Sequence, residues 1–167
     1  MADFLEEDFE EEDTQRGRFL TFTLEDNVYG LPIRFVIEII GIHTATKVPE
    51  TPDFVKGIIN LRGRIIPLID VRLKFGKEEI PYDERTCIIV IDVNSVALGL
   101  IVDKVDDVLT LEDDQIALPP SGGALGFENR YIEGIGKVGD AVLLLLDAEK
   151  LLKTDEMEII ENIADNA

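Results

Sequence analysis

The chain has 167 residues and a formal net charge of −19 at pH 7, with 35 acidic and 16 basic residues. Its apolar fraction of 46% is sufficient for a hydrophobic core. The acidic excess argues against binding to nucleic acid and against docking on an anionic membrane, because both need basic residues. No apolar run approaches the roughly 20 residues of a membrane-spanning helix, so no direct membrane insertion is expected.

The N-terminal segment is strongly acidic. Residues 1–13 include eight Asp or Glu residues, and such a block repels itself. We therefore expect residues 1–16 to be a disordered acidic tail. The segment lacks the basic and apolar stretches of a secretory signal peptide, and a single cysteine excludes an intramolecular disulfide. These features are typical of a cytoplasmic protein.

The remainder of the chain is typical of short β-strands. Segments of four to seven residues, rich in β-branched and aromatic side chains, alternate with Gly, Asn, Asp or Pro. The predicted strands are 19–24, 58–61, 65–69, 87–93, 96–102 and 141–146. This pattern predicts an all-β barrel or sandwich.

Three short helices are also predicted, at 34–39, 71–75 and 148–164. The last carries spaced apolar residues, including Leu151, Leu152 and Ile159, which would pack on the body. We expect residues 151–167 to form this C-terminal helix and a tail.

An internal repeat organises the chain. Segment 19–39 matches segment 88–108, and in this alignment Gly30 falls on Gly99. Segment 54–70 likewise matches segment 131–147. The second copy is longer between its two matching segments, which fits a longer loop there. The repeat predicts two similar β-units, 17–85 and 86–150, that lie side by side.

Few residues of the sequence suggest a catalytic, metal-binding or cofactor-binding site. The chain has no Cys/His cluster and no glycine-rich phosphate loop, so we expect no metal and no cofactor. The one histidine, His43, is expected to be a non-catalytic residue in a strand. Asp70 and Asp147 occupy equivalent positions of the repeat and could form a hydrolytic pair of carboxylates. Each follows a strand and precedes a predicted helix, and capping is the simpler interpretation.

Arg62 has two possible roles. It lies between two apolar strands in the turn Asn60-Leu61-Arg62-Gly63. It could make two-pronged contacts with a carboxylate or with backbone oxygens, or it could be a solvated turn residue.

The segment from Phe54 to Arg72, FVKGIINLRGRIIPLIDVR, resembles the most characteristic segment of the CheW family of bacterial chemotaxis coupling proteins. The Tyr29-Gly30 pair, the stretch 36–39 and Gly99 match the same family, and the resemblance covers about residues 17–160. It implies two five-stranded SH3-like β-barrels, related by a pseudo-twofold axis, around a shared apolar interface. It also implies a non-enzymatic adaptor that links transmembrane chemoreceptors to the histidine kinase CheA in membrane-associated arrays.

The resemblance further implies two binding surfaces. The receptor's helical tip would bind between the barrels, and the kinase's regulatory domain would bind at loop ends. The receptor-binding residues implied by position are Val36, Glu38, Ile39, Arg62, Val105 and Val108. The kinase-binding residues would be Phe54, Lys56 and Gly57. The same domain occurs fused to a receiver domain or within the kinase, and this sequence contains neither additional part, so we expect a separate adaptor.

Overall fold

The computed structural model describes residues 16–119 and 130–151. The predicted acidic tail lies outside this part of the chain except for Arg16. Most of the predicted C-terminal helix, residues 152–164, also lies outside it, and residues 148–150 form a turn.

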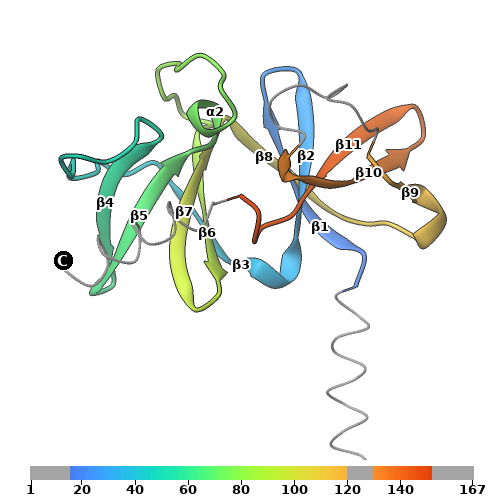
Figure 1. Cartoon of the computed structure of the whole chain (residues 1–167), viewed down its shortest axis with the longest axis horizontal. Helices are drawn as coiled ribbons and strands as arrows, with labels where there is room; N and C mark the ends of the chain where they lie inside the picture. Colours follow the sequence, from blue (N-terminus) through green and yellow to red (C-terminus); the bar gives the residue numbers. More distant parts are fainter. Residues whose placement is uncertain (1–15, 120–129, 152–167) are drawn as a thin grey trace, which may run out of the picture.

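The described residues form two sheets that lie side by side (Figure 1). Sheet A has the strand order β8-β1-β2-β11-β10-β9, and sheet B has the order β3-β6-β7-β5-β4. The strands of sheet A are β1 (Arg18–Leu24), β2 (Asn27–Pro32), β8 (Lys104–Thr110), β9 (Ile116–Ala117), β10 (Ile132–Val138) and β11 (Ala141–Leu146). The strands of sheet B are β3 (Val36–Gly41), β4 (Val55–Leu61), β5 (Arg64–Asp70), β6 (Cys87–Val93) and β7 (Val96–Val102). Short helical segments are η1 (Ile33–Phe35), α2 (Val71–Lys74) and η2 (Asp113–Gln115).

The all-β class is confirmed, and every predicted strand is present with small changes at its ends. The predicted helix at 71–75 is also confirmed as α2. The helix predicted at 34–39 is wrong, because only the 3-10 turn η1 forms there, and it leads into strand β3. The β-branched residues of β3 favour an extended backbone, which pairs with β6 from Val36↔Ile91 to Gly41↔Cys87.

The duplication is confirmed in the strand pairing. The first match of the repeat takes β1, β2 and β3 to β6, β7 and β8, and the second match takes β4 and β5 to β10 and β11. The parallel pair Leu68↔Gly99 of sheet B corresponds to Leu145↔Gly30 of sheet A. The β-bulges recur too, since Val55/Gly57 on β4 corresponds to Ile132/Gly134 on β10.

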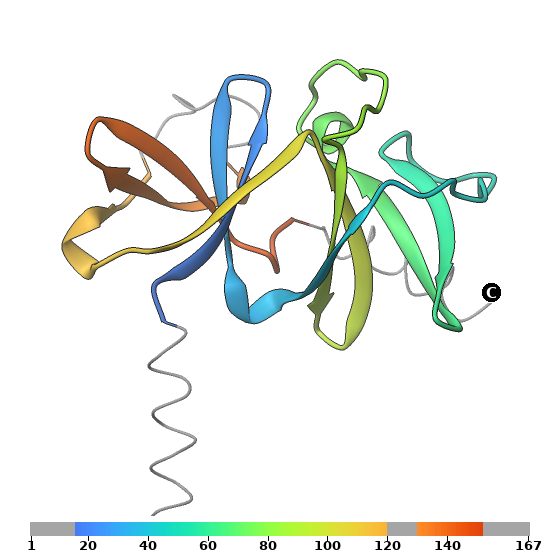
Figure 2. The same ribbon diagram turned by 180° about the vertical axis from the view of Figure 1, so that it is seen from behind.

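The two copies of the repeat exchange strands, however. Sheet B contains β3, β4 and β5 from the first copy and β6 and β7 from the second, and sheet A combines the other strands. The chain passes from sheet A to sheet B along β3 and returns along β8, and both crossing strands lie on the face seen in Figure 2. The boundary expected between residues 85 and 86 therefore separates the copies of the repeat but not the sheets, because β1 and β6 each pair with a crossing strand.

The core consists of one cluster between the sheets and one smaller cluster within each sheet. Alternate residues of β6 belong to two clusters. Ile88 and Val90 belong to the cluster of sheet B, while Ile89, Ile91 and Val93 belong to the cluster between the sheets, which we call the shared cluster. A row of four aromatic rings, Phe22, Tyr29, Phe75 and Tyr131, crosses the interface with ring centroids 5.4–5.5 Å apart; the two outer contacts are stacked and the middle one is tilted. Each buried apolar side chain contributes about 1.5–3 kcal/mol, so the shared cluster is the main stabilising contact between the sheets.

Gly57 is required by the close approach of two segments of sheet B. Its φ is +135°, and a Cβ atom there would lie 2.3 Å from the carbonyl oxygen of Thr46. The contact allows Thr46 and Ile58 to exchange backbone hydrogen bonds of 2.9 Å, which close the loop after β3 onto β4.

We expect Gly57→Ala to lower the free energy of unfolding by about 2–4 kcal/mol, because it combines backbone strain with displacement of residue 46. Urea unfolding followed by circular dichroism measures the change. Gly41→Ala is the matched control, because a Cβ atom there meets nothing within 4 Å, and its effect is expected to stay within about 0.5 kcal/mol. Equal effects of the two substitutions would contradict this explanation.

Candidate functional site

Asp70 and Asp147 both act as caps. Asp70 is 2% exposed, and its carboxylate accepts hydrogen bonds from the amide of Leu73 at 3.3 Å and from the hydroxyl of Tyr82 at 2.8 Å. Burial and the bond to Asp70 raise the pKa of Tyr82. Asp147 accepts bonds from the amides of Glu149 at 3.0 Å and Lys150 at 3.3 Å. The capping interpretation is confirmed, and the described residues show no hydrogen bond between the two carboxylates.

We expect Asp70→Ala to lower the free energy of unfolding by about 1–3 kcal/mol, because the substitution removes a cap and leaves the Tyr82 hydroxyl without its acceptor. Asp147→Ala is expected to cost about 1 kcal/mol or less, because its carboxylate is more exposed than that of Asp70 and, among the described residues, accepts no bond from a tyrosine hydroxyl. Chemical denaturation of both variants tests the order. A larger loss for Asp147→Ala would contradict the assignment.

The six predicted receptor-binding residues come from both sheets. Val36, Glu38 and Ile39 lie on β3 of sheet B, and Val105 and Val108 lie on β8 of sheet A. Val36 and Val105 are half-buried against the shared cluster, whereas Ile39 and Val108 are 43% and 45% exposed. The repeat relates Val36 to Val105 and Ile39 to Val108, so the two crossing strands, which lie on the same face in Figure 2, carry equivalent apolar residues.

Arg62 reaches this region from the hairpin between β4 and β5. Arg62 and Gly63 have φ values of +53° and +84°, as a two-residue type I′ turn requires. Asn60 stabilises the turn by accepting a bond from the Gly63 amide at 2.8 Å. The Arg62 guanidinium then donates to Oε2 of Glu38 and forms an ion pair. Of the two interpretations of Arg62, the structure therefore supports contact with a carboxylate.

The ion pair leaves one carboxylate oxygen free. Oε1 of Glu38 is buried and has no hydrogen-bond partner among the described residues. The hydrogen bond from Arg62 lowers the pKa of Glu38, and the same bond raises the pKa of Arg62. Glu38 therefore keeps its negative charge to lower pH than an isolated glutamate does.

We expect a carbon-detected NMR titration to give a Glu38 pKa below the ordinary glutamate value, and the Arg62→Ala variant to restore the ordinary value. Because the folded-state pKa of Glu38 is lowered, the ion pair is complete above the ordinary glutamate pKa. It is lost as the pH falls through the folded-state pKa. A Glu38 pKa that does not differ between the wild type and Arg62→Ala would show that the pair does not persist in solution.

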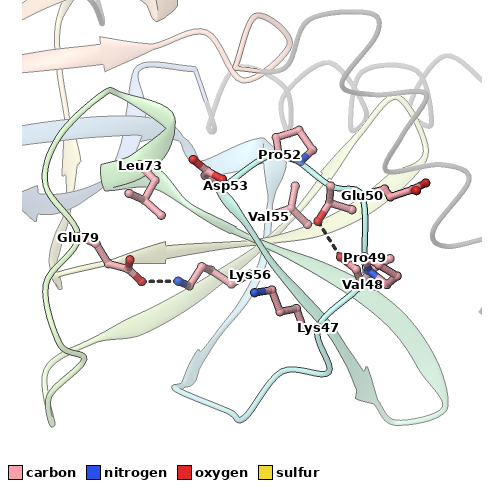
Figure 3. Close-up of a pocket in the computed structure, with 11 residues that line it drawn as sticks. Lys47, Val48, Pro49, Glu50, Pro52, Asp53, Val55, Lys56, Leu73 and Glu79 are labelled. Atoms are coloured by element: carbon pink, nitrogen blue, oxygen red, sulfur yellow. Dashed lines mark hydrogen bonds and ion pairs between the residues drawn. The ribbon is translucent and has the colours of Figure 1, made fainter.

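The predicted kinase-binding residues lie around the start of β4. The Lys74 ammonium lies 4.3 Å from the ring centroid of Phe54, and Lys56 pairs with Glu79. Gly57 is buried and shapes the backbone, as described above. The residues adjoin a hollow of about 440 Å³. Its lining includes Lys47, Val48, Pro49, Pro52, Val55, Lys56, Leu73 and Glu79 (Figure 3).

The position of His43 differs from the sequence-based expectation, and one ion pair was not expected from the sequence. His43 follows β3 instead of lying in a strand, and its exposed ring has Nδ1 2.8 Å from the carbonyl oxygen of Gly41. The sequence-based reasoning also missed an ion pair between Arg72 and Asp103. The repeat contained a signal for it, because Glu149 and Arg34 occupy the equivalent positions with the charges exchanged.

Within residues 16–119 and 130–151, no group of three or more His, Cys, Asp or Glu side chains could hold a metal ion. In the same part of the chain, no helix has the length and apolar character needed to cross a membrane.

Two sheets that exchange strands between the copies of a repeat, and share one apolar interface, define a duplicated all-β domain. The family model of the CheW-like domain matches residues 18–156, and the chain belongs to this family. It is 42% identical over 152 residues to the chemotaxis protein CheW of Klebsiella aerogenes, with 91% of each chain covered. The chemotaxis protein CheW of Helicobacter pylori is 33% identical over 146 residues, with 87% of each chain covered.

A solved structure is similar as well. The crystal structure of the scaffolding protein TtCheW from Thermoanaerobacter tengcongensis matches with a TM-score of 0.77 and 34% sequence identity. The match covers 84% of this chain and 94% of the solved chain. The likeness therefore extends over both sheets.

Proposed function

We propose that this chain is a chemotaxis coupling protein, a non-enzymatic scaffold that links the cytoplasmic tips of transmembrane chemoreceptors to the histidine kinase CheA. It would act in the cytoplasm, recruited to membrane-associated receptor arrays. Family membership supports this proposal, as do relatives named as chemotaxis and scaffolding proteins. The proposed alternative, a hydrolase that uses Asp70 and Asp147, is disfavoured because both carboxylates serve as caps.

The observation that carries the proposal is the ion pair between Glu38 of β3 and Arg62, on the strand that also carries the exposed Ile39. A helix that binds a protein surface presents apolar residues along one face and polar residues beside it. Ile39 and Val108 would contact the apolar side of a receptor helix. Glu38 and Arg62 would contact its polar side, or would open to meet polar groups of the receptor.

The kinase surface would be separate. Lys56 and Gly57 lie on β4 of sheet B and Phe54 directly precedes that strand; Lys56 lines the hollow in Figure 3. Its lining combines apolar residues with Lys47, Lys56 and the acidic residues Glu50, Asp53 and Glu79, so it would suit a protruding apolar side chain with polar or charged groups around it. Two separate surfaces would let one small chain hold both partners at the same time.

We expect Arg62→Ala to weaken binding of a receptor signalling fragment at least tenfold. Truncating one partner of a desolvated interfacial charge pair costs about 2–5 kcal/mol, and a tenfold change corresponds to about 1.4 kcal/mol. Binding of the CheA regulatory domain is expected to stay within about threefold, because its proposed surface lies elsewhere. Isothermal titration calorimetry with both partners measures the two affinities on the same variant.

Arg64→Ala is the matched control, because Arg64 is an exposed arginine of the same hairpin that forms no ion pair within the described residues. It is expected to leave both affinities unchanged. A loss of kinase affinity without a loss of receptor affinity in Arg62→Ala would contradict the proposed division of the surface.

A further inference from the structure

A second ion pair joins the sheets beside α2, whose residues Leu73 and Lys74 adjoin the proposed kinase surface. Arg72 of α2 follows β5 of sheet B, and Asp103 lies between β7 of sheet B and β8 of sheet A. Nε of Arg72 donates to Oδ1 of Asp103 at 2.7 Å, and an Nη atom donates to Oδ2 at 2.6 Å. Such a two-pronged contact fixes orientation as well as distance. The Arg72 side chain is 10% exposed, so it has little surface for a binding partner.

The contact extends to the first hairpin of sheet A. The amide of Glu25, in the turn between β1 and β2, donates to Oδ2 of Asp103 at 3.0 Å. The Glu25 carboxylate lies 3.5 Å from Arg72 and 3.2 Å from Nζ of Lys77. Arg72 also donates to the carbonyl oxygen of Glu78 at 3.2 Å. The four residues Glu25, Arg72, Lys77 and Asp103, which we call the inter-sheet clamp, thus connect α2 to both the hairpin and the crossing strand.

The charges of the clamp stabilise one another. Burial of Asp103 favours its neutral form, but hydrogen bonds from Arg72 and from the Glu25 amide outweigh burial and lower the pKa of Asp103. The bond to Asp103 likewise raises the pKa of Arg72. Removing Arg72 would leave a partly buried carboxylate without its main partner, which strongly disfavours the present position of Asp103.

Asp103 directly precedes β8, which starts at Lys104, so Arg72 holds the residue at which the chain leaves sheet B. From there, β8 is held along β1 by side-chain bonds that follow in order. Thr23 donates to Asp106 at 2.6 Å, and Thr21 exchanges two bonds of 2.9 and 3.0 Å with the backbone of Asp107. Strand β8, with Val105 and Val108, is thus fixed to β1, and Asp103 connects both β8 and the β1–β2 turn to Arg72 on the side of sheet B.

Among the described residues, only one of the two crossing strands, β8, is held by such a clamp. The equivalent residues of the repeat are Arg34 and Glu149, and in the described part of the chain they form no ion pair within 4.0 Å. The shared apolar cluster is present for both copies of the repeat, so cohesion of the sheets does not explain why only one crossing strand is clamped. A role that concerns β8 in particular explains this difference.

We propose that Arg72 is a positioning residue for receptor binding, because it sets the position of β8 relative to β3 without touching the receptor. This inference rests on the proposed function. It follows from the division of the receptor-binding residues, of which Val105 and Val108 belong to sheet A and the others to sheet B. The proposed kinase surface lies at β4 of sheet B and adjoins α2, but it includes no residue of sheet A, so a shift of β8 relative to β3 would not divide it.

The experiment compares the full-length wild type with Arg72→Met and Arg72→Lys. Calorimetry measures affinity for a receptor signalling fragment and for the CheA regulatory domain. In a Cys87→Ala background, spin labels at exposed positions 64 and 137 measure the distance between the sheets by pulsed electron paramagnetic resonance. Arg72→Lys keeps the charge but loses the two-pronged contact, and it serves as a folded variant if Arg72→Met does not fold.

Arg72→Met is expected to broaden or shift the distance distribution and to weaken receptor binding at least tenfold, with kinase binding within threefold. Arg72→Lys is expected to recover most of the affinity, with a distribution broader than that of the wild type. The control is Arg16→Met, which removes an arginine paired with Asp113 at 3.8 Å whose side chain is 73% exposed. It is expected to change neither measurement.

An unchanged distance distribution in both Arg72 variants would overturn the proposal. So would a changed distribution with unchanged receptor affinity, or an equal loss of affinity for both partners. If the wild type itself does not bind the receptor fragment, the proposed function fails, and the distance measurement still decides whether Arg72 fixes the two sheets relative to each other.

Discussion

The apolar interface between the two sheets is the constraint on which the rest of the structure depends. Strands of both sheets supply it, and several are buried on both faces, as β7 is from Ala97 to Val102. A strand buried on both faces has a continuous apolar sequence instead of an alternating one. The runs of β6, β7 and β11 therefore follow from the architecture: one face of each strand fills its own sheet and the other fills the interface. Neither sheet could keep these strands buried without the other.

The exchange of strands makes the interface inseparable from the chain path. Because β3 and β8 cross from one sheet to the other, the two strands that carry the proposed receptor-binding residues are also the connections between the sheets. A partner bound across β3 and β8 would thus contact both halves of the repeat, whereas a partner bound at β4 would contact one sheet. The duplication alone does not produce this difference. It arises from the way in which the two copies are interlaced.

Local pattern and internal repetition made much of the fold predictable. Short β-branched runs located the strands, and the two matches of the repeat made the pairings of β5 with β7 and of β11 with β2 equivalent. The exchange of strands was not predictable in this way, because the repeat is equally consistent with two separate units. The error at Arg34–Ile39 has a related cause: apolar residues at helical spacing in an edge strand resemble a helix until the partner strand β6 is known. The family resemblance placed Glu38 and Arg62 on one surface, and the fold showed that they form an ion pair. The Arg72–Asp103 pair joins residues 31 positions apart and was recognised only in the fold.

Apolar burial is non-directional, so the shared cluster holds the sheets together without fixing their relative orientation uniquely. A hydrogen-bonded ion pair adds little net stability when partly buried, but its geometry is specific. The two types of contact are therefore complementary: the cluster supplies cohesion, and the inter-sheet clamp selects one arrangement among those that the cluster permits. The same reasoning applies to the proposed receptor-binding residues. In the proposed complex, Ile39 and Val108 would adapt to many apolar partners, whereas the Glu38–Arg62 pair, held by a tight turn, would impose orientation. In both places the proposals assign cohesion to apolar side chains and specificity to a charged pair.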